Sequence, residues 1–489
     1  MKTTSFWPRI FLVFFVLQIG LAKASPFIGL NDKQLHHDLQ TLSEWGYLDA
    51  TVTTYPVPWK GVASQIKRLK SADMPYMPAQ ALNRLKHYLH MAQSEKQLSF
   101  FEIQGNSDTP RLTALDGANY HQISATIKHQ VLFDQVYVQG AVTIDQDGDV
   151  NFDHSLMAYQ FENWQVRVGA IEQYWGPSQA SSLILSNNAR PLPAIAVSRG
   201  STSVSSSPWL SWLGNWYYTG QLAFLESNRT VPNAKLLLNR FTFSPIKRLE
   251  IGASWAVMWG GDTQTEGLSE FLKMITFQST CLKPAGDCTR AEETKQGNHL
   301  AGFDLKYSFN VWDRPVTIYA QRIGEDATDN IKITDNANLI GASTYLGAAK
   351  IFVETSDTQI SCISAESTVT NCFYEHGTYK TGYRYRGRAI GSTFDSDAKQ
   401  VTLGTNYRFK GGAIAEVLLR KVELNPDGRL PSPVLTDATS EDLLQISGFY
   451  QRPIGDWLIK AGGSIEKRDF DGTETQTDAS LYINSTYSF

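Results

Sequence analysis

Hydrophobic and polar positions change their period once along the chain, near residue 98. Before this point apolar residues recur every three or four positions, in the segments 35–42, 59–69 and 82–89. This spacing is typical of amphipathic helices. The sequence therefore predicts three short helices in residues 30–97, with Asn31 or Asp32 capping the start of the first. So small a bundle has little core of its own, and we expect it to pack on a larger body.

After residue 98 apolar and polar positions alternate in segments of about ten residues, which Gly, Asp, Asn and Pro separate. In Val401–Phe409, for example, Thr402, Asn406 and Arg408 share one face. Alternation of this kind predicts β-strands. The clearest segments are Phe133–Ile144, Trp164–Tyr174, Leu249–Trp259, Val316–Ile323, Val401–Phe409, Ile414–Val422 and Leu443–Tyr450.

The regular polar faces favour an all-β transmembrane barrel, which is apolar outside and polar inside. A soluble β-sandwich also alternates, but its apolar faces meet in a core. Aromatic residues near the expected strand ends suit the girdles of a membrane barrel. About 390 residues follow position 98, so we expect 16–18 antiparallel strands beside the small N-terminal α-helical bundle, at roughly 20–25 residues per strand and connection. Such a barrel has an aqueous lumen unless something fills it.

The first 24 residues form a separate segment. Lys2 and Arg9 form a positively charged region before an apolar run, Ile10–Leu17. Ala22-Lys23-Ala24 is a cleavage signal of small residues. This is the pattern of a secretory signal peptide, and the apolar run is too short for a membrane anchor. No later stretch reaches the roughly 18 apolar residues that a spanning helix needs.

The chain ends in a strand-like segment, Leu481–Phe489, whose apolar residues share one face with the terminal Phe489. This segment resembles the C-terminal strand that the barrel-assembly machinery reads in outer-membrane proteins. We therefore expect a signal peptide in 1–24, a periplasmic helical bundle or plug in 25–97, and an outer-membrane barrel with extracellular loops in 98–489. The expected partners include outer-membrane lipids and, through Phe489, the barrel-assembly machinery.

Composition and charge narrow the class of protein further. Only 19% of the 489 residues are charged and 12% are aromatic, which excludes a disordered chain. The formal net charge of −4 becomes −7 without Lys2, Arg9 and Lys23. Because no basic block is present, we expect no nucleic-acid partner.

The four cysteines fall into two local pairs, Cys281/Cys288 and Cys362/Cys372, among turn and polar residues. In an exported protein such pairs predict disulfides that pin loops. Zinc is the alternative, but the chain has no C-x-x-C and no His inside either pair, so we expect no metal and no cofactor.

The sequence gives little support for an enzyme. It contains no G-x-S-x-G, H-E-x-x-H or Walker-type motif. His36, His37, His87 and His90 fall in the helical segment, where we expect them on solvated faces. We therefore expect no catalytic residues.

Two polar stretches are candidate binding sites. The first stretch contains Asn187, Asn188 and Arg190, which follow a Gly-Pro turn. These side chains either donate hydrogen bonds to a ligand or satisfy buried backbone groups of a loop that folds into the protein. In Tyr383–Arg388, strict alternation places Arg384, Arg386 and Arg388 on one face. Three guanidiniums in a row suit an acidic polysaccharide, or a luminal ladder paired with carboxylates of neighbouring strands.

Four tryptophans, Trp175, Trp209, Trp212 and Trp216, are candidates of a second kind. Indole faces stack well on sugar rings. They also form the aromatic belt of a membrane interface, which is the interpretation we favour for the last three.

Several of these motifs together resemble the Wzi-type capsule-assembly outer-membrane proteins. The resemblance is carried by Trp175-Gly176-Pro177-Ser178, Leu185–Pro191, Trp209–Gly214, Leu249–Gly252 with Trp259-Gly260-Gly261, and Tyr383–Gly391. It covers most of residues 27–489, including the N-terminal helices. The cysteine pairs are not part of the family pattern and suggest divergent outer loops.

The resemblance implies an 18-stranded outer-membrane barrel with a periplasmic helical bundle. It also implies a lectin that holds capsular polysaccharide or exopolysaccharide on the cell surface without exporting it. The alternative class is a sugar- or anion-selective porin that uses the arginines as a filter. An enzyme acting on glycan or lipid is the third, and no motif supports it.

Overall fold

The computed structural model describes residues 25–30, 32–94, 97–115, 120–205, 207–262, 264, 266–275, 297–325, 327–328, 332–333, 336–363, 368–370, 372–426, 428, 434–435, 440–470 and 474–489. The predicted signal peptide, Cys281 and Cys288 lie outside these residues, as does the side chain of Cys362. Cys372 is described and buried. The pairing of the cysteines therefore stays a prediction.

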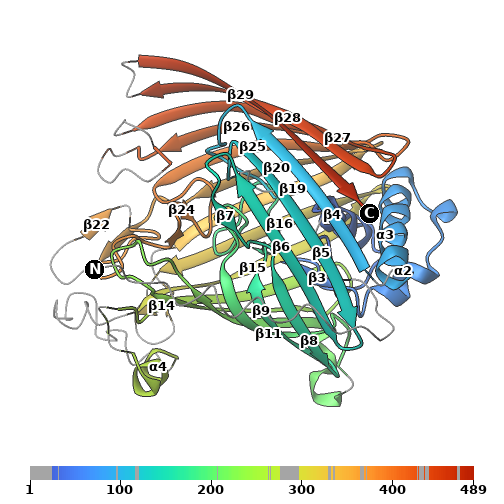
Figure 1. Ribbon diagram of the computed structural model, residues 1–489, viewed down its shortest axis with the longest axis horizontal. Coiled ribbons are helices and arrows are strands. Elements are labelled where there is room, and N and C mark those ends of the chain that lie inside the picture. The colour runs from blue at the N-terminus through green and yellow to red at the C-terminus, as the bar shows by residue number, and fades with distance from the viewer. Residues whose placement is uncertain are drawn as a thin grey trace.

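Eighteen antiparallel strands close into a barrel, the upper end of the predicted range (Figure 1). The last strand pairs with the first, with Tyr487 opposite Phe101. The strands are β4 (Gln97–Asn106), β5 (Ile123–Phe133), β6 (Val136–Asp145), β8 (Leu156–Phe161), β9 (Trp164–Ala170), β11 (Pro193–Arg199), β12 (Asn215–Phe224), β13 (Lys235–Ser244), β14 (Leu249–Trp259), β15 (Asn298–Val311), β16 (Arg314–Glu325), β19 (Asn336–Leu346), β20 (Ala349–Asp357), β25 (Ala398–Arg408), β26 (Ile414–Leu424), β27 (Glu441–Ile454), β28 (Trp457–Phe470) and β29 (Glu474–Ser488). The short β7 (Val150–Asn151) pairs with one part of β6, and β8 pairs with another part of the same strand.

The two faces of the wall follow the alternation of the sequence. In β25, Val401 and Leu403 are 50% and 47% exposed on the outside, whereas Thr402, Asn406 and Arg408 are buried in the lumen. A sandwich would bury the apolar face, so the exposure of these apolar residues identifies the wall of a barrel. The predicted faces of Val401–Phe409 are confirmed.

The two ends of the barrel differ in the length of their connections. At one end the strands are joined by tight turns such as 134–135, 312–313, 347–348 and 455–456, with 200–214 as the long exception. The other end carries the long connections 107–122, 171–192, 260–297, 358–397 and 425–440. The C-terminus and helices α2 (Ala63–Arg68) and α3 (Tyr76–Ser94) lie at the turn end, and α4 (Leu268–Ile275) lies at the long-loop end (Figure 1).

The N-terminal helices are present, but the first one lies inside the barrel. The apolar side of α1 (Gln34–Glu44) packs on α3 around Leu39, Leu42 and Leu85. Its polar side meets luminal residues of the wall, since the Asn406 amide donates to Gln34 and the Lys350 ammonium to Glu44. The N-cap position is Lys33, which makes no side-chain cap hydrogen bond, and not Asp32 as predicted. Asp32, one residue earlier, accepts the Gln34 N–H at 3.0 Å.

Short elements complete the described chain. They are β1 (Phe27–Ile28) paired with β3 (Val57–Pro58), β2 (Thr54–Tyr55) paired with β10 (Tyr174–Trp175), η1 (Ser71–Asp73), η2 (Pro208–Leu213), β17 (Ala327–Thr328) with β18 (Lys332–Ile333), β21 (Ser361–Ile363) with β22 (Thr368–Thr370), and β23 (Arg384–Tyr385) with β24 (Arg388–Ala389). Within the described ranges, none of the helices has the length and apolar character needed to cross a membrane.

Candidate functional site: the inward loops and the luminal cavity

Three segments at the long-loop end fold into the lumen, and we call 107–115, 171–192 and 372–397 the inward loops. The carboxylate of Glu354 in β20 accepts the backbone N–H groups of Gln179, Ala180 and Ser181, at 2.8, 3.3 and 3.3 Å. In β16, Gln321 accepts the N–H of Leu183. These luminal side chains satisfy loop backbone groups that would otherwise be buried without partners.

The inward loops form one apolar core with the wall. Trp175, Leu183 and Ile184 of one loop pack in the same cluster as Phe373, Tyr374 and Tyr383 of another, together with wall residues such as Leu238 and Leu339. All are at most 3% exposed. The lumen is therefore filled at this level by packed side chains and not by solvent.

The predicted polar residues of the first stretch hold the inward loops together. The Asn187 amide donates to the Leu115 carbonyl at 2.8 Å, and the Asn188 amide donates to the Ala389 carbonyl at 2.9 Å. Both side chains are buried. Arg190 is less enclosed and donates to Asp153 at 2.7 Å. Of the two alternatives left open by the sequence, these contacts match the folded-in loop.

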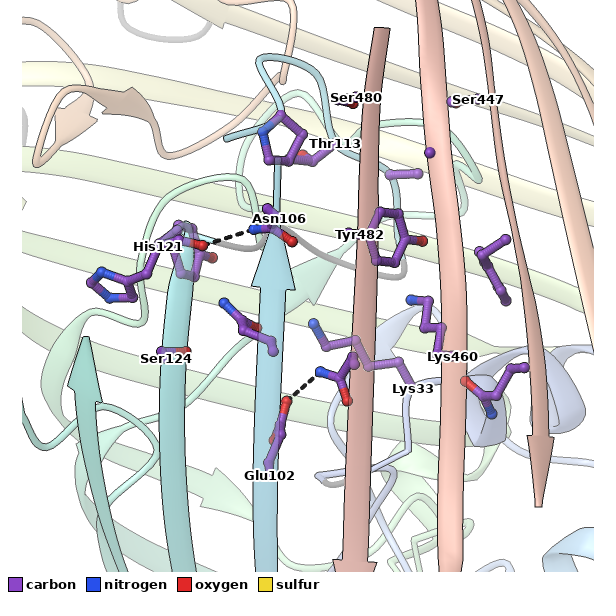
Figure 2. A pocket seen from close by; sticks show the side chains of 18 of the residues that line it. Lys33, Glu102, Asn106, Thr113, His121, Ser124, Ser447, Lys460, Ser480 and Tyr482 are labelled. Carbon is purple, nitrogen blue, oxygen red and sulfur yellow. Dashed lines mark hydrogen bonds between the residues drawn. The ribbon is translucent and has the colours of Figure 1, made fainter. Parts of the chain in front are cut away.

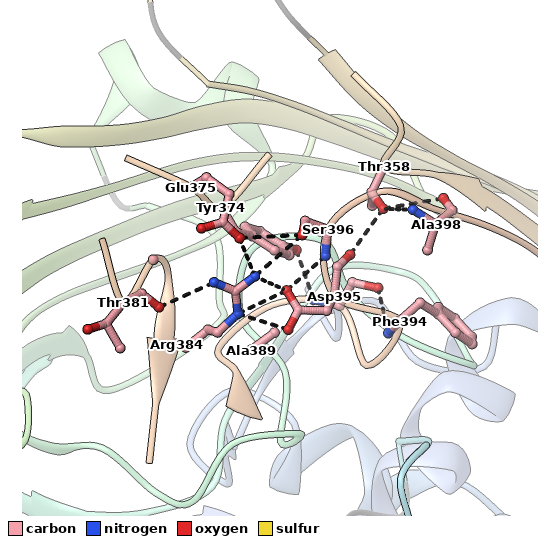
Figure 3. A network of polar contacts seen from close by, with 12 residues as sticks. Thr358, Tyr374, Glu375, Thr381, Arg384, Ala389, Phe394, Asp395, Ser396 and Ala398 are labelled. Atoms are coloured by element: carbon pink, nitrogen blue, oxygen red, sulfur yellow. Dashed lines mark hydrogen bonds and ion pairs between the residues drawn. The ribbon is translucent and has the colours of Figure 1, made fainter. Parts of the chain in front are cut away.

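Arg384 lies in a network of carboxylates within one inward loop (Figure 3). Its guanidinium binds Asp395 at 2.7 Å and Glu375 at 2.5 Å, and its side chain is 5% exposed. Burial by itself lowers the pKa of Arg384, but the two carboxylates outweigh it and raise the pKa. A luminal ladder would require acidic partners on neighbouring strands. The acidic partners of Arg384 come instead from its own loop.

The predicted row of three arginines on one strand face is wrong. The segment is a hairpin, β23 and β24, with Arg386 and Gly387 as its two turn residues at φ of 48° and 81°. A two-residue turn with both φ values positive matches the twist of a hairpin, and glycine favours it. Arg388 consequently turns away from Arg384 and donates to the carbonyls of Pro110 and Arg111. Arg386 is exposed at the tip.

The four tryptophans separate into two groups. Trp175 is 0% exposed, so its prediction as a girdle or sugar-stacking residue is wrong. The reason is that β9 ends at Ala170, and the chain leaves the wall before it reaches Trp175. Trp209 and Trp212 are 87% and 64% exposed at the turn end, and Trp216 is half-buried beneath the guanidinium of Arg199, 3.9 Å from its ring centre.

Buried charges that sequence reasoning did not single out hold the plug. Glu44 of α1 meets Lys306 and Lys350 of the wall at 3.1 and 3.0 Å. Burial raises the pKa of Glu44, but the two ammonium groups reverse this and lower it to about 2. On the same helix Asp38 meets Arg408 at 3.0 Å. Charges on the luminal strand face were visible in the sequence, but their partners, some 300 residues away, were not.

A polar cavity of about 240 Å³ remains between the plug and the inner wall of β4, β5, β28 and β29 (Figure 2). Lys33 enters it from the plug and Lys460 from β28, while Glu102 and Tyr482 enter from β4 and β29. Lys33 is paired with Glu172 at 2.5 Å and Lys128 with Glu102 at 2.9 Å. Over the described part of the chain, no group of three or more His, Cys, Asp or Glu residues could hold a metal ion.

The fold and the site define a plugged β-barrel with an apolar exterior and inward-folded loops. Residues 92–481 match the family model described as capsule assembly protein Wzi, which is most of the chain. The chain belongs to this family.

Two proteins illustrate the similarity. A solved Escherichia coli structure, described as Wzi, an outer membrane protein involved in group 1 capsule assembly and a carbohydrate-binding β-barrel, aligns with a TM-score of 0.79 at 23% identity, covering 95% of this chain and 100% of that one. An uncharacterised 55.8 kDa protein in the cps region of Klebsiella pneumoniae is 27% identical over 342 residues, which span 68% of this chain and 65% of the relative. Pseudomonas aeruginosa OpdQ aligns over 80% of this chain and 97% of its own with a TM-score of 0.45 at 10% identity, a likeness too distant to support a functional conclusion.

Proposed function

We propose that this protein is an outer-membrane lectin that binds capsular or related surface polysaccharide and holds it on the cell during capsule assembly. Family membership supports this function, and so does the description of the E. coli Wzi structure as a carbohydrate-binding barrel. Outer-membrane lipid surrounds the apolar exterior in this proposal. The protein catalyses no reaction and binds its polymer without a cofactor.

The observation that carries the proposal is the filling of the lumen from both ends. The plug helix α1 is held in the lumen at the turn end through Glu44 and Asp38, and the inward loops fill much of the lumen at the other end through contacts with Glu354 and Gln321. A porin needs a continuous aqueous path between the two ends. Binding at the surface is therefore the better account of this barrel than transport through it.

The two ends of the barrel give the proposed orientation. Membrane barrels have short turns on the periplasmic side and longer loops outside. We infer that α2, α3 and the exposed Trp209 and Trp212 lie on the periplasmic side, where the tryptophans contact the lipid interface, and that the long loops face the medium. The barrel-assembly machinery recognises the strand that ends at Phe489. This topology follows cleavage of a signal peptide at residue 24.

The polysaccharide contacts in this proposal are on the long-loop face. Arg386 is the exposed member of the predicted arginines, and its guanidinium lies 5.6 Å from the ring centre of Tyr385. Arg190 is half-buried and paired with Asp153 at 2.7 Å. Disulfides in the pairs Cys281/Cys288 and Cys362/Cys372 pin the outer loops. Many weak contacts along a repeating polymer add through multivalency.

Two measurements on the purified barrel in detergent test the function. Polysaccharide from the cell that encodes the chain should be retained by the immobilised protein, and an unrelated plugged barrel serves as the control. In planar bilayers the protein should give no steady conductance. A large steady conductance together with no polymer retention would replace the lectin with the porin.

A further inference from the structure

The outer face of the wall changes abruptly from apolar to charged at the long-loop end of the neighbouring strands β25–β28 (Figure 1). The last fully apolar row across these strands consists of Leu403, Leu419, Ile446 and Ile465, all of which are exposed. Two positions further along each strand, on the same face, the next row consists of Val401, Lys421, Leu444 and Lys467. Two exposed lysines therefore lie at the edge of the apolar surface, one on each side of Leu444.

The position of these lysines matches the boundary of a membrane. On β28, Trp457 lies at the turn end of the outer face, and Lys467 follows ten positions later. The outward residues between them are Ile459, Ala461, Gly463 and Ile465, none of which is charged. Ten strand residues rise about 34 Å, which at a tilt of about 40° spans roughly 26 Å of membrane. The apolar band of an outer-membrane barrel is about 25 Å tall, so Lys467 lies where acyl chains end and headgroups begin.

The two boundaries of this band carry different side chains. At the turn end, Trp457 packs against Tyr487 with ring centres 4.9 Å apart, and Tyr407 packs against Phe409 at 4.6 Å. Aromatic rings of this kind suit the headgroup level of most membranes. At the long-loop end, β26 and β28 carry lysine at the boundary instead. Because exposed lysines attract anionic headgroups, this end of the wall favours an anionic leaflet.

A row of carboxylates lies beyond the lysines. Two further positions along the strands, on the same face, Glu423, Asp442 and Asp469 stand opposite one another on β26, β27 and β28. Glu423 lies 3.5 Å from Lys421, but exposed pairs of this kind are weak and leave the ammonium available to another anion. An acidic polymer that approaches from the medium meets the negative row first and is repelled by it. A ligand that lies in the membrane reaches the lysines from the apolar side.

We propose that Lys421 and Lys467 bind the phosphate groups of a phosphorylated lipid in the membrane leaflet at the long-loop end. Leu419, Ile446 and Ile465 contact its acyl chains. The ligand is amphipathic because the lysines and the apolar row form one continuous surface, and phosphate is the anion that lipid headgroups place at this boundary. The lysines are two strand spacings apart, about 10 Å, so each binds a phosphate of its own. This site goes beyond retention of polysaccharide and rests only on the membrane orientation proposed above.

A double substitution with a matched control tests the site. Lys421→Gln/Lys467→Gln removes both charges at the boundary, whereas Lys247→Gln/Lys410→Gln removes two charges from exposed turns at the opposite end of the barrel. The purified barrel in uncharged detergent is titrated with three probes, namely lipid A that carries two phosphate groups, the same lipid after enzymatic removal of its phosphates, and inorganic phosphate. Native mass spectrometry measures the lipid bound per barrel, and circular dichroism verifies the fold.

We expect the wild type to bind the phosphorylated lipid about tenfold more tightly than the dephosphorylated lipid. Lys421→Gln/Lys467→Gln should lose this preference, Lys421→Arg/Lys467→Arg should keep it, and the turn-end variant should stay within twofold of wild type. A preference that survives in the glutamine variant, or inorganic phosphate that displaces the lipid at equal concentration, overturns the site. Should the glutamine variant not fold, Lys467→Gln alone should lower the preference about threefold, and no loss overturns the site.

Retention of polysaccharide by the same variants separates this site from the lectin function. We expect the glutamine variant to retain polymer as the wild type does. If its retention falls while its affinity for the phosphorylated lipid is unchanged, the lysines bind polymer, so the lipid site is overturned and the lectin function stands. If the wild type retains no polymer but keeps its preference for the phosphorylated lipid, the lectin function fails and the lipid site stands.

Discussion

Glu44, in the last turn of the plug helix, holds its carboxylate 3.0 Å from the ammonium of Lys350 in the barrel wall. Lys306 approaches the same oxygen at 3.1 Å, and the Tyr345 hydroxyl donates to the other at 2.5 Å. All of these side chains are nearly inaccessible to solvent. The contact joins the N-terminal helix to strands β15, β19 and β20, so it fixes the plug inside the lumen.

Replacement of Glu44 by Gln should release the plug. The variant leaves Lys306 and Lys350 buried without their counter-ion, and the loss of one partner from such a group costs about 3–5 kcal/mol. We expect a lower unfolding midpoint in detergent and current bursts in planar bilayers. The control is Glu423→Gln, which breaks an exposed pair with Lys421 at 3.5 Å. Exposed pairs contribute about 0–1 kcal/mol, so a similar loss in both variants would contradict the role of Glu44.

Acidification should loosen the plug through two histidines. Burial lowers the pKa of His36 to about 3 and, with nearby Lys350 and Arg408, lowers the pKa of His37 well below its usual value. Because both histidines bind protons more tightly in the unfolded chain, their neutral forms stabilise the fold above pH 6.5. That stability is lost as the pH falls from 6.5 toward 3, at most about 1.4 kcal/mol per pH unit for each histidine.

Hydrogen exchange of the α1 amides between pH 7 and 4, corrected for intrinsic rates, measures this effect. Glu44 keeps its charge over the same range, since its pKa is about 2. The double variant His36→Gln/His37→Gln should show a smaller pH dependence than wild type. Equal slopes in the two proteins would assign the acid response to other groups.

Substitutions of Arg384 and Arg386 should have different effects, the first on folding of the barrel and the second on polysaccharide binding. Arg384→Ala leaves Asp395 buried without its cation, so we expect a lower level of folded barrel or a leaking pore. Arg386 is exposed, so Arg386→Ala should leave folding and conductance unchanged and weaken retention of an acidic polymer in a salt-dependent way. Normal folding and conductance of Arg384→Ala would show that the carboxylate network does not seal the loop.

Quenching of tryptophan fluorescence should show whether Trp209 and Trp212 contact lipid. In vesicles of brominated phospholipid, Trp209 and Trp212 should be quenched, as should Trp312 and Trp457, which are 92% and 38% exposed at the same end. Trp209→Phe/Trp212→Phe should therefore remove only the share of the quenched emission that the first two residues contribute. The buried Trp175 keeps its emission in both proteins. Polysaccharide retention should be unaffected by this double substitution. A loss of retention at a normal protein level would instead assign the two residues to the sugar.

Replacement of the Phe489 side chain should affect assembly of the barrel more than its stability. Phe489 closes the barrel seam by exchanging backbone hydrogen bonds of 3.0 Å with Ser99, while its side chain is 66% exposed. Phe489→Ala keeps the backbone bonds and removes the aromatic ring. We expect less assembled barrel in the outer membrane, with refolding of the purified protein in detergent unchanged. Equal loss in both assays would indicate a purely structural role.

The parts of the fold that depend on local pattern could be predicted. The strand β14 begins and ends where the alternation of Leu249–Trp259 does, because each residue of a wall strand faces either lipid or lumen. The third helix was also expected, and α3 carries Leu82, Leu85 and Leu89 on its buried side. His87 and His90 are exposed as predicted.

What depends on contacts between distant segments could not be predicted. His36 and His37 were expected on a solvated face, and this is wrong because α1 lies inside the barrel, where they are 1% and 5% exposed. Asn188 and Arg388 bind one another at 3.0 Å across 200 positions of sequence. One local signal was available and missed, since Gly387 readily adopts the positive φ that the second position of a two-residue hairpin turn requires.

The central claim is that this barrel retains surface polysaccharide and does not transport it. Its most direct test is the amount of polymer on the cell and in the medium, measured in encapsulated cells that lack the protein and in the same cells with the gene restored. The account predicts unchanged total polymer, with most of it shed into the medium until the gene is restored. Polymer that stays on the cells, or a fall in its total amount, would contradict the claim.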